Sequence, residues 1–293
     1  MNNLKMKKGR SVITYIMLVI LAAYAIALIG VLLWAIMTSF KSLDDFRANP
    51  AFLPKVFSWN YGIVYNAYSI QVLFNDELYY VGMLEMYFNS VAYALGGAFF
   101  QTMVTCITAY VCARYPFRFS KVLHSIVIVT MIIPVVGNLV SEIQVATALG
   151  LTYHIWGTWI MKANFMGLYF LVFYEFSKSL SPSYFEAARI DGANDWHILL
   201  RIALPLLRNL ILTVMLINFI AYWNDYQIPL IYIPNKPTIS YGMYYFSFGR
   251  TDNELAGVPM YMAAAILVVV PVIAVFLCFH KKLLGNLTVG GVK

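Results

Sequence analysis

Six long runs of apolar residues, with few or no charged side chains, alternate along the chain with shorter polar segments. A bilayer core about 30 Å thick needs about 20 apolar residues in a helix, so each run is long enough to cross it. Lys162 interrupts the fourth run. The pattern predicts an all-α membrane protein with six transmembrane helices, at residues 11–40, 86–113, 122–141, 154–176, 209–228 and 255–280.

These runs divide the chain into a single membrane domain with short tails. Within the core, residues 178–208 form a polar loop between the fourth and fifth runs, and residues 229–254 form a turn-rich loop with several Pro and Gly residues. The expected parts are an N-terminal tail (1–11), the first transmembrane helix (12–39), a long loop (40–85), a core of five helices (86–281) and a C-terminal tail (282–293).

Composition supports a membrane protein: 61% of the residues are hydrophobic and 11% are charged, against about 25% charged in soluble domains. The chain carries 20 Lys and Arg residues and a net charge of +7. Most of these residues lie in both tails, after the second run and after the fourth. Cytoplasmic loops collect Lys and Arg, so we expect both termini and residues 178–208 in the cytoplasm and residues 40–85 and 229–254 outside. This asymmetry accounts for the positive charge without a nucleic-acid partner.

Polar groups within the runs are mostly uncharged, and the middles of most runs carry no ionisable residue. A proton-coupled carrier normally keeps ionisable groups there. We expect Lys162 to reach the outer interface with its ammonium group; a pairing with Glu142 or a place on a polar pathway are the alternatives. The candidates for a substrate pathway or outer gate are Asn89, Asn138, Asn224 and Asp225.

No motif for metal or nucleotide binding is present. The three cysteines show no paired spacing and the four histidines show no metal-binding spacing. The phosphate-binding loop GxxxxGK[ST] needs a Gly-Lys pair, and the sequence contains none. We therefore expect no cofactor in this chain and no catalytic residue. If transport is driven by ATP, then ATP and Mg²⁺ bind to separate ATPase subunits.

The polar segment SPSYFEAARIDGANDWHILLRIALP has the pattern of a helix, a break and a second helix. Ser181 precedes Pro182, which is favourable in a first helical turn. Ser183 and Glu186 also have the spacing of a capping box. Gly192 ends the first helix, since glycine adopts the left-handed conformation without steric cost.

The second helix of this segment begins at Asn194 or Asp195, either of which is a good N-cap, and we expect it to end at Pro205. Ala187 and Ala188 leave a low surface that a partner's backbone can approach closely. On this pattern alone, an ordinary interfacial loop, in which Glu186 only caps a helix, is an equal alternative to a docking element.

The same segment resembles the EAA loop of the membrane subunits of binding-protein-dependent ABC importers. Its motif consists of the EAA triplet at 186–188, Gly192, and IALP at 202–205. Further stretches resemble MalG-like carbohydrate permeases: FKSLDDF (40–46), FNSVAYA (88–94), YWNDYQIPL (222–230) and the ending LTVGGVK (287–293). The chain departs from these relatives in a longer loop at 69–86, in Lys162 and in Gly291.

This resemblance implies the type I ABC importer permease fold in a bacterial cell membrane and a role in carbohydrate uptake. It also implies four kinds of partner: a second, MalF-like permease, two ATP-binding subunits, an extracellular or periplasmic sugar-binding protein, and the lipid bilayer. The residues expected to couple to the ATPase are Glu186, Ala187, Ala188, Asp191, Gly192, Ile202, Leu204 and Pro205.

Three alternatives remain open at this point. A permease for another solute, such as a polyamine, phosphate or glycerol phosphate, fits the coupling motif equally well. A secondary sugar carrier requires coupling charges in the membrane, which are largely absent. An intramembrane enzyme requires a nucleophile with a base, or a metal site, and the sequence shows neither.

Overall fold

The computed structural model describes residues 12–74, 76–115, 117–133, 137–249 and 257–287. Two compact units are present: Met1–Ala67 with Arg250–Leu267, and Tyr68–Gly249 with Val268–Lys293. Among the described residues, four helices are long and apolar enough to cross a membrane. They cover Val12–Ser39, Met83–Arg114, Asp195–Trp223 and Val258–Cys278.

The first unit begins with helix α1 (Val12–Ser39), which is followed by the short helices α2 (Leu43–Ala48) and α3 (Asn60–Ala67). Helix α1 is apolar on every side and almost entirely exposed, as expected of a helix surrounded by lipid. Polar contacts stabilise the conformation of the segment that follows α1. The buried Lys41 donates to the carbonyl of Asn49 at 2.6 Å, and Asn60 donates to the carbonyls of Ser39 and Lys41 at 2.8 and 2.7 Å.

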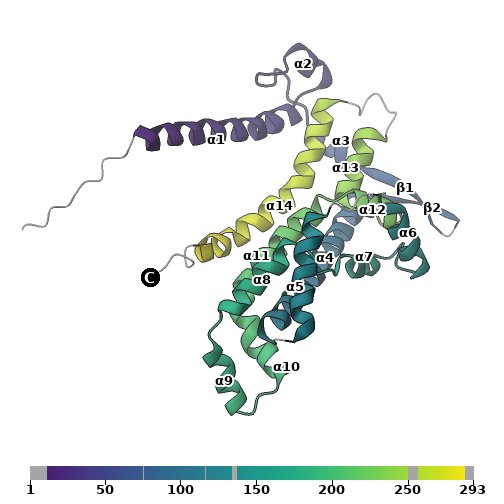
Figure 1. The fold of residues 1–293 in the computed structure, drawn as a ribbon. Helices are drawn as coiled ribbons and strands as arrows, with labels where there is room; N and C mark the ends of the chain where they lie inside the picture. The colour runs from purple at the N-terminus through teal and green to yellow at the C-terminus, as the bar shows by residue number, and fades with distance from the viewer. Residues whose placement is uncertain (1–11, 75, 116, 134–136, 250–256, 288–293) are drawn as a thin grey trace, which may run out of the picture. The chain divides into compact units, whose positions relative to one another are not determined.

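The second unit is a helical bundle around α4 (Met83–Arg114) (Figure 1). Helices α5 (Arg118–Ile132), α7 (Ile155–Lys162), α8 (Leu168–Ser179) and α11 (Leu204–Trp223) all pack against α4. Small residues on α4 permit this close packing. A Cβ atom on Gly96 would lie 2.2 Å from the Trp159 ring, and one on Gly97 would lie 3.1 Å from Tyr222.

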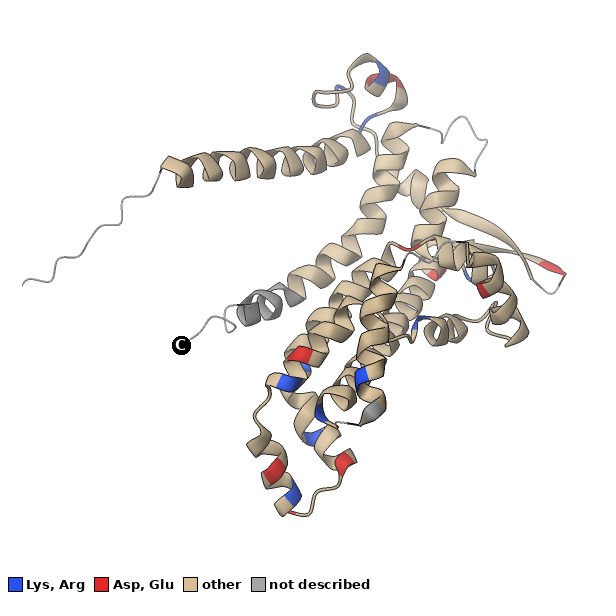
Figure 2. Cartoon of the chain, viewed as in Figure 1, with Lys and Arg blue, Asp and Glu red and all other residues tan. Residues whose placement is uncertain are grey.

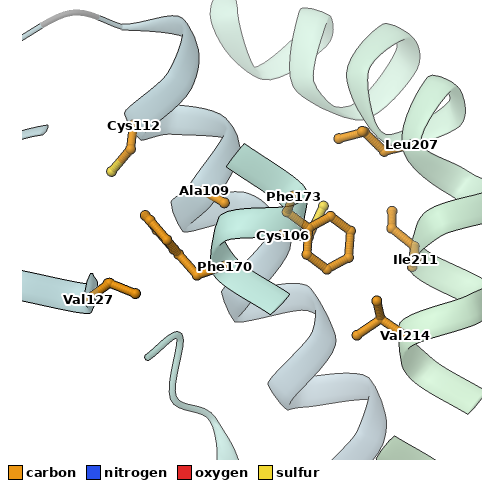
Figure 3. Close-up of a cluster of buried hydrophobic side chains, with 9 residues drawn as sticks. All are labelled: Cys106, Ala109, Cys112, Val127, Phe170, Phe173, Leu207, Ile211 and Val214. Atoms are coloured by element: carbon orange, nitrogen blue, oxygen red, sulfur yellow. The ribbon is translucent and has the colours of Figure 1, made fainter. Parts of the chain in front are cut away.

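An apolar cluster lies in the bundle beside the C-terminal part of α4 (Figure 3). Phe170 and Phe173 of α8 are fully buried; Phe173 lies on the side of α11 and Phe170 on the side of Val127 of α5 (Figure 3). Two cysteines are members of the cluster, which agrees with a packing role for small, weakly polar side chains. The remaining members are Cys106, Ala109, Cys112, Val127, Leu207, Ile211 and Val214.

The third and fourth apolar runs do not form single continuous helices, contrary to the sequence-based expectation. Helix α5 ends at Ile132, and α6 (Leu139–Ala148) is a separate helix. In the fourth run, α7 ends at Lys162 and α8 starts at Leu168, after Gly167 with φ of +132°. That backbone conformation is accessible to glycine and strained for other residues, so the break is encoded locally.

The expectation of an all-helical chain is also wrong in one place. Within residues 40–85, strands β1 (Ser69–Phe74) and β2 (Glu77–Gly82) form an antiparallel hairpin, with Ile70 opposite Val81 and Phe74 opposite Glu77. Strand β2 leads directly into α4. The polarity of this segment suggested a loop, yet its β-branched and aromatic residues favour strands.

The loop expected at 229–254 contains regular structure as well. Helix α12 (Gln227–Tyr232) and helix α13 (Ile239–Phe248) occupy most of it, and residues 250–254 lie outside the described part of the chain. Thr238 is the N-cap of α13 and accepts from the amide of Tyr241. The last helix, α14 (Val258–Leu287), contains Pro271 in its interior.

Candidate functional site

The segment with the EAA triplet folds as two helices at one end of the bundle. Helix α9 spans Pro182–Ile190, with Ser181 as its N-cap. The expected capping box of Ser183 and Glu186 is not formed, because Ser183 lies inside the helix and its hydroxyl contacts that of Ser181 at 2.8 Å. Glu186 is exposed, so its carboxylate is accessible to a partner.

Gly192 ends α9 as expected. Its φ is +80°, in the left-handed region. The amide of Gly192 donates to the carbonyl of Arg189 at 3.0 Å, and the amide of Ala193 donates to the carbonyl of Ala188 at 2.9 Å. These two bonds form a Schellman motif, which fixes the direction in which the chain leaves α9.

The second helix begins at Asn194, whose side chain accepts from the amide of His197 at 2.8 Å. Helix α10 (Asp195–Ile198), the π-helical turn η1 (Leu199–Ala203) and α11 then run on without interruption to Trp223. The expected end at Pro205 is therefore wrong. Proline has no amide proton and crowds the carbonyl four residues earlier; the wider π turn just before Pro205 accommodates both effects.

The two alanines of the triplet have different surroundings. Ala187 is exposed, whereas Ala188 is buried against Tyr110 of α4 and Leu199 of η1. The expectation that both alanines form a low outer surface is thus corrected: Ala187 faces outward, and Ala188 joins the two helices to the bundle. This packing cluster also contains Phe185, Ile198 and Ala203.

Polar and charged side chains connect the helix pair to the end of α4. The Arg114 guanidinium lies 4.3 Å from the centre of the Phe185 ring, in a cation–π contact, and donates to the carbonyl of Leu180. The Tyr115 hydroxyl donates to Asp195 at 2.8 Å. Burial, and then this hydrogen bond, raise the pKa of Tyr115, so the hydroxyl remains a proton donor at neutral pH.

The eight coupling residues predicted from the sequence therefore fall into three places. The exposed tip of the pair carries Glu186, Ala187, Asp191 and Gly192, while Ala188 is packed inside. Lys and Arg residues are concentrated near this end of the bundle (Figure 2). The remaining three residues lie along the continuous helix that leads away from the tip: Ile202, Leu204 and Pro205.

A second polar site lies at the opposite end of α11. The Lys162 ammonium is 3.2 Å from Asp225 Oδ2 and 4.5 Å from the centre of the Tyr222 ring. The same carboxylate accepts from the Tyr93 hydroxyl at 2.7 Å and, through Oδ1, from the amide of Ile228 at 3.2 Å. The partner of Lys162 is therefore Asp225 rather than Glu142.

The other candidate pathway residues have separate surroundings. Asn89 is buried and donates to the carbonyl of Pro237 at 3.1 Å, so it joins α4 to the segment before α13. Asn224 donates to Ile220 of its own helix at 2.8 Å. Asn138 donates to Glu142. Only Asn138 lines a cavity with Lys162; the cavity measures about 570 Å³, and its other polar lining residues are Ser141, Glu142 and Asn164.

Sequence reasoning missed the contacts of Lys162 and Tyr93 with Asp225. A signal was present: Lys162 and Asp225 are oppositely charged residues within predicted transmembrane segments, where such groups usually pair. Two further polar contacts were also not predicted: Tyr222 with Gln101, and Asn218 with Thr102 at 3.1 Å. The sequence alone does not indicate which polar residues of different helices contact each other.

Known proteins are similar to this chain in sequence and in fold. It is 25% identical over 276 residues to the diacetylchitobiose uptake system permease protein NgcG of Streptomyces coelicolor, covering 92% of this chain and 86% of that protein. It is 29% identical over 216 residues to the melibiose/raffinose/stachyose import permease protein MelC of Bacillus subtilis, covering 68% and 77%.

A solved structure agrees in fold. A bacterial ABC transporter involved in the import of the acidic polysaccharide alginate matches with a TM-score of 0.77 and 21% identity, over 93% of this chain and 98% of that one. Residues 101–284 match the family described as the binding-protein-dependent transport system inner membrane component. This range includes helix α9, the continuous helix from Asp195 to Trp223, and Asp225. The chain is a multi-pass membrane protein and belongs to this family of transport-system membrane components.

Proposed function

We propose that this chain is one permease subunit of an ATP-driven ABC importer that carries a carbohydrate of oligosaccharide size into a bacterial cell. The relatives support the solute class, since their names refer to diacetylchitobiose, to melibiose, raffinose and stachyose, and to maltodextrin. The chain itself is the transport subunit and has no catalytic role. It pairs with a second, homologous MalF-like permease.

The observation that carries this proposal is the helix pair α9–α10 and its rigid connection to the membrane. The exposed tip of the pair offers Glu186 and Ala187 to a partner. From Asp195, one 29-residue helix continues to Trp223, a length of about 43 Å at 1.5 Å per residue. A displacement of the tip by an ATPase subunit therefore moves the far end of the same helix.

The proposed topology has six crossings, with both termini in the cytoplasm. Four crossings correspond to the long apolar helices. The other two are broken: α5 with α6, and α7 with α8. Irregular backbone at membrane depth is tolerated where it is buried in protein or lines a water-filled cavity. The cavity beside Asn138, Lys162 and Asn164 adjoins the break between α7 and α8, so we place the solute pathway there.

The proposed partners follow from this topology. Two ATPase subunits, which hold ATP and Mg²⁺, dock on the cytoplasmic side, one of them at α9–α10. A sugar-binding protein delivers the solute outside, where residues 40–85 and 229–254 lie. The lysine and arginine residues near α9 and α10 (Figure 2) support a cytoplasmic position for this end by the positive-inside rule.

Reconstitution tests the proposal directly. The complete importer in proteoliposomes should accumulate a labelled oligosaccharide only when ATP and the binding protein are both present. Uptake by vesicles that lack the ATPase would support a secondary carrier instead. Accumulation of a polyamine, phosphate or glycerol phosphate in place of every sugar tested would retain the ABC permease and overturn the solute class.

A further inference from the structure

The β1–β2 hairpin is a firmly held projection of the second unit. On its inner face, Ile70, Val72 and Val81 are buried. The Tyr79 hydroxyl donates to the carbonyl of Asn235 at 2.7 Å, and just before β1 the Tyr68 hydroxyl donates to the carbonyl of Ile239, also at 2.7 Å. These contacts fix both strands to the segment around α13, so the hairpin presents its other face in one orientation.

The outward face of the hairpin is apolar. The register places Leu73 opposite Leu78, and Gln71 opposite Tyr80. The exposed fractions of Leu73, Leu78 and Tyr80 are 66%, 63% and 70%. Apolar side chains grouped on a rigid exposed surface are typical of an interaction site.

The position of this face argues against lipid as its occupant. Strand β2 ends at Gly82, where the membrane helix α4 begins. The Leu73–Leu78 pair lies toward the tip, about 17 Å along the strand from Met83 at roughly 3.4 Å per residue. Asp76 and Glu77 form the acidic tip beyond it (Figures 1 and 2). Since carboxylates avoid the hydrocarbon core, the tip extends into water.

We propose that this face of the hairpin docks the solute-binding protein of the importer, an inference that rests on the proposed function. Leu73, Leu78 and Tyr80 provide the apolar and aromatic centre of the interface, and Asp76 and Glu77 provide a charged rim. The partner's matching surface is an apolar patch bordered by Lys or Arg. A second permease is the weaker fit, because the apolar pair lies at the end of the hairpin remote from the membrane.

The test uses the assembled importer in lipid nanodiscs and its purified solute-binding protein. Basal ATP hydrolysis is measured first, and then its stimulation over a range of binding-protein concentrations. The variants are Leu73→Ser with Leu78→Ser, and Asp76→Lys with Glu77→Lys. Leu149→Ser is the matched control, since this leucine is 65% exposed at the C-cap of α6, outside the hairpin.

Each hairpin variant should raise the half-saturating concentration of binding protein about tenfold, the scale of an interface side chain worth about 1.4 kcal/mol. Basal hydrolysis and the Leu149→Ser control should match the unmodified importer. A photo-crosslinker at position 78 should capture the binding protein, and this readout is independent of how well the serine variants fold.

Unchanged stimulation in both variants, or a crosslink to the second permease, would overturn the docking proposal. If the unmodified importer does not respond to the binding protein at all, the proposed function itself fails.

Discussion

The Lys162 ammonium and the Asp225 carboxylate, 63 residues apart in sequence, form an ion pair of 3.2 Å between the end of α7 and the junction of α11 with α12. About one fifth of each side chain is exposed, so the charges are only partly solvated. Tyr93 of α4 joins the pair through the same carboxylate oxygen. Three elements therefore meet at this carboxylate, at the end of the continuous helix farthest from α9.

Removal of either charge should destabilise the protein more than removal of both. Lys162→Met leaves a partly buried carboxylate without its cation, and Asp225→Asn leaves an ammonium without its anion, each at a cost of about 2 kcal/mol. The double variant leaves neither charge unpaired. A double-mutant cycle on thermal unfolding in detergent measures the coupling; strictly additive effects would show that the pair contributes nothing.

The different environments of Ala187 and Ala188 predict different effects of the same substitution. Leucine at 188 must displace the packed side chains of Tyr110 and Leu199, and overpacking of this kind costs about 1–3 kcal/mol. Leucine at the exposed position 187 should leave stability unchanged and reduce the affinity of the permease for its ATPase. The measurements are thermal unfolding and co-purification of the ATPase.

Thiol labelling separates the two alanines without a bulky side chain. In a background with Cys278→Ser, because Cys278 is the exposed native cysteine among the described residues, Ala187→Cys should react with a hydrophilic maleimide in inside-out vesicles and Ala188→Cys should not. Equal labelling at both positions would contradict the packing of α9. Protection of position 187 by the ATPase would locate the contact.

The close approach of α4 and α7 predicts a strong effect at Gly96. A Cβ atom there would lie 2.2 Å from the Trp159 ring, while the indole nitrogen is held by a bond to the carbonyl of Ala92 at 3.0 Å. Gly96→Ala should therefore lower stability by about 1–3 kcal/mol. Gly30→Ala on α1 is the control: no atom lies within 4 Å of its Cβ position, and alanine favours a helix by about 1 kcal/mol. Comparable unfolding temperatures for both variants would argue against this helix contact.

Local rules predicted the helix pair well, because its determinants are close in sequence. Gly192 and Asn194 act through backbone groups a few residues away, and both fulfil the roles expected of them. The pairing of Lys162 with Asp225 depends instead on how α7 and α11 pack, which a single sequence does not specify. The hairpin was missed for a related reason. Strand formation depends on how a face is packed, and Ile70 and Val72 are buried against a segment that is distant in the sequence.

Hydropathy likewise located the membrane segments, but it did not show which of them form one continuous helix. Residues 154–176 are apolar enough for one span, yet Gly167 interrupts the helix through its φ of +132°. In the opposite sense, Pro205 suggested an end where the helix continues, because the π turn before it relieves the steric conflict. Both errors arise from backbone geometry that an average of side-chain hydrophobicity does not report.

The left-handed conformation of Gly192 leads to the sharpest prediction about coupling. Among the described residues, no atom beyond its chain neighbours lies within 4 Å of its Cβ position, so a substitution there meets no clash, and its effect arises from the φ of +80°. Gly192→Val should cost about 1–2 kcal/mol in this conformation, or else shift the angle between α9 and α10. Gly192→Asn is the matched control, because asparagine adopts the left-handed region readily.

In proteoliposomes, the valine variant should retain ATP hydrolysis with much reduced uptake, while the asparagine variant remains close to the unmodified importer. Normal uptake with valine at 192 would show that the angle between the two helices does not transmit the motion.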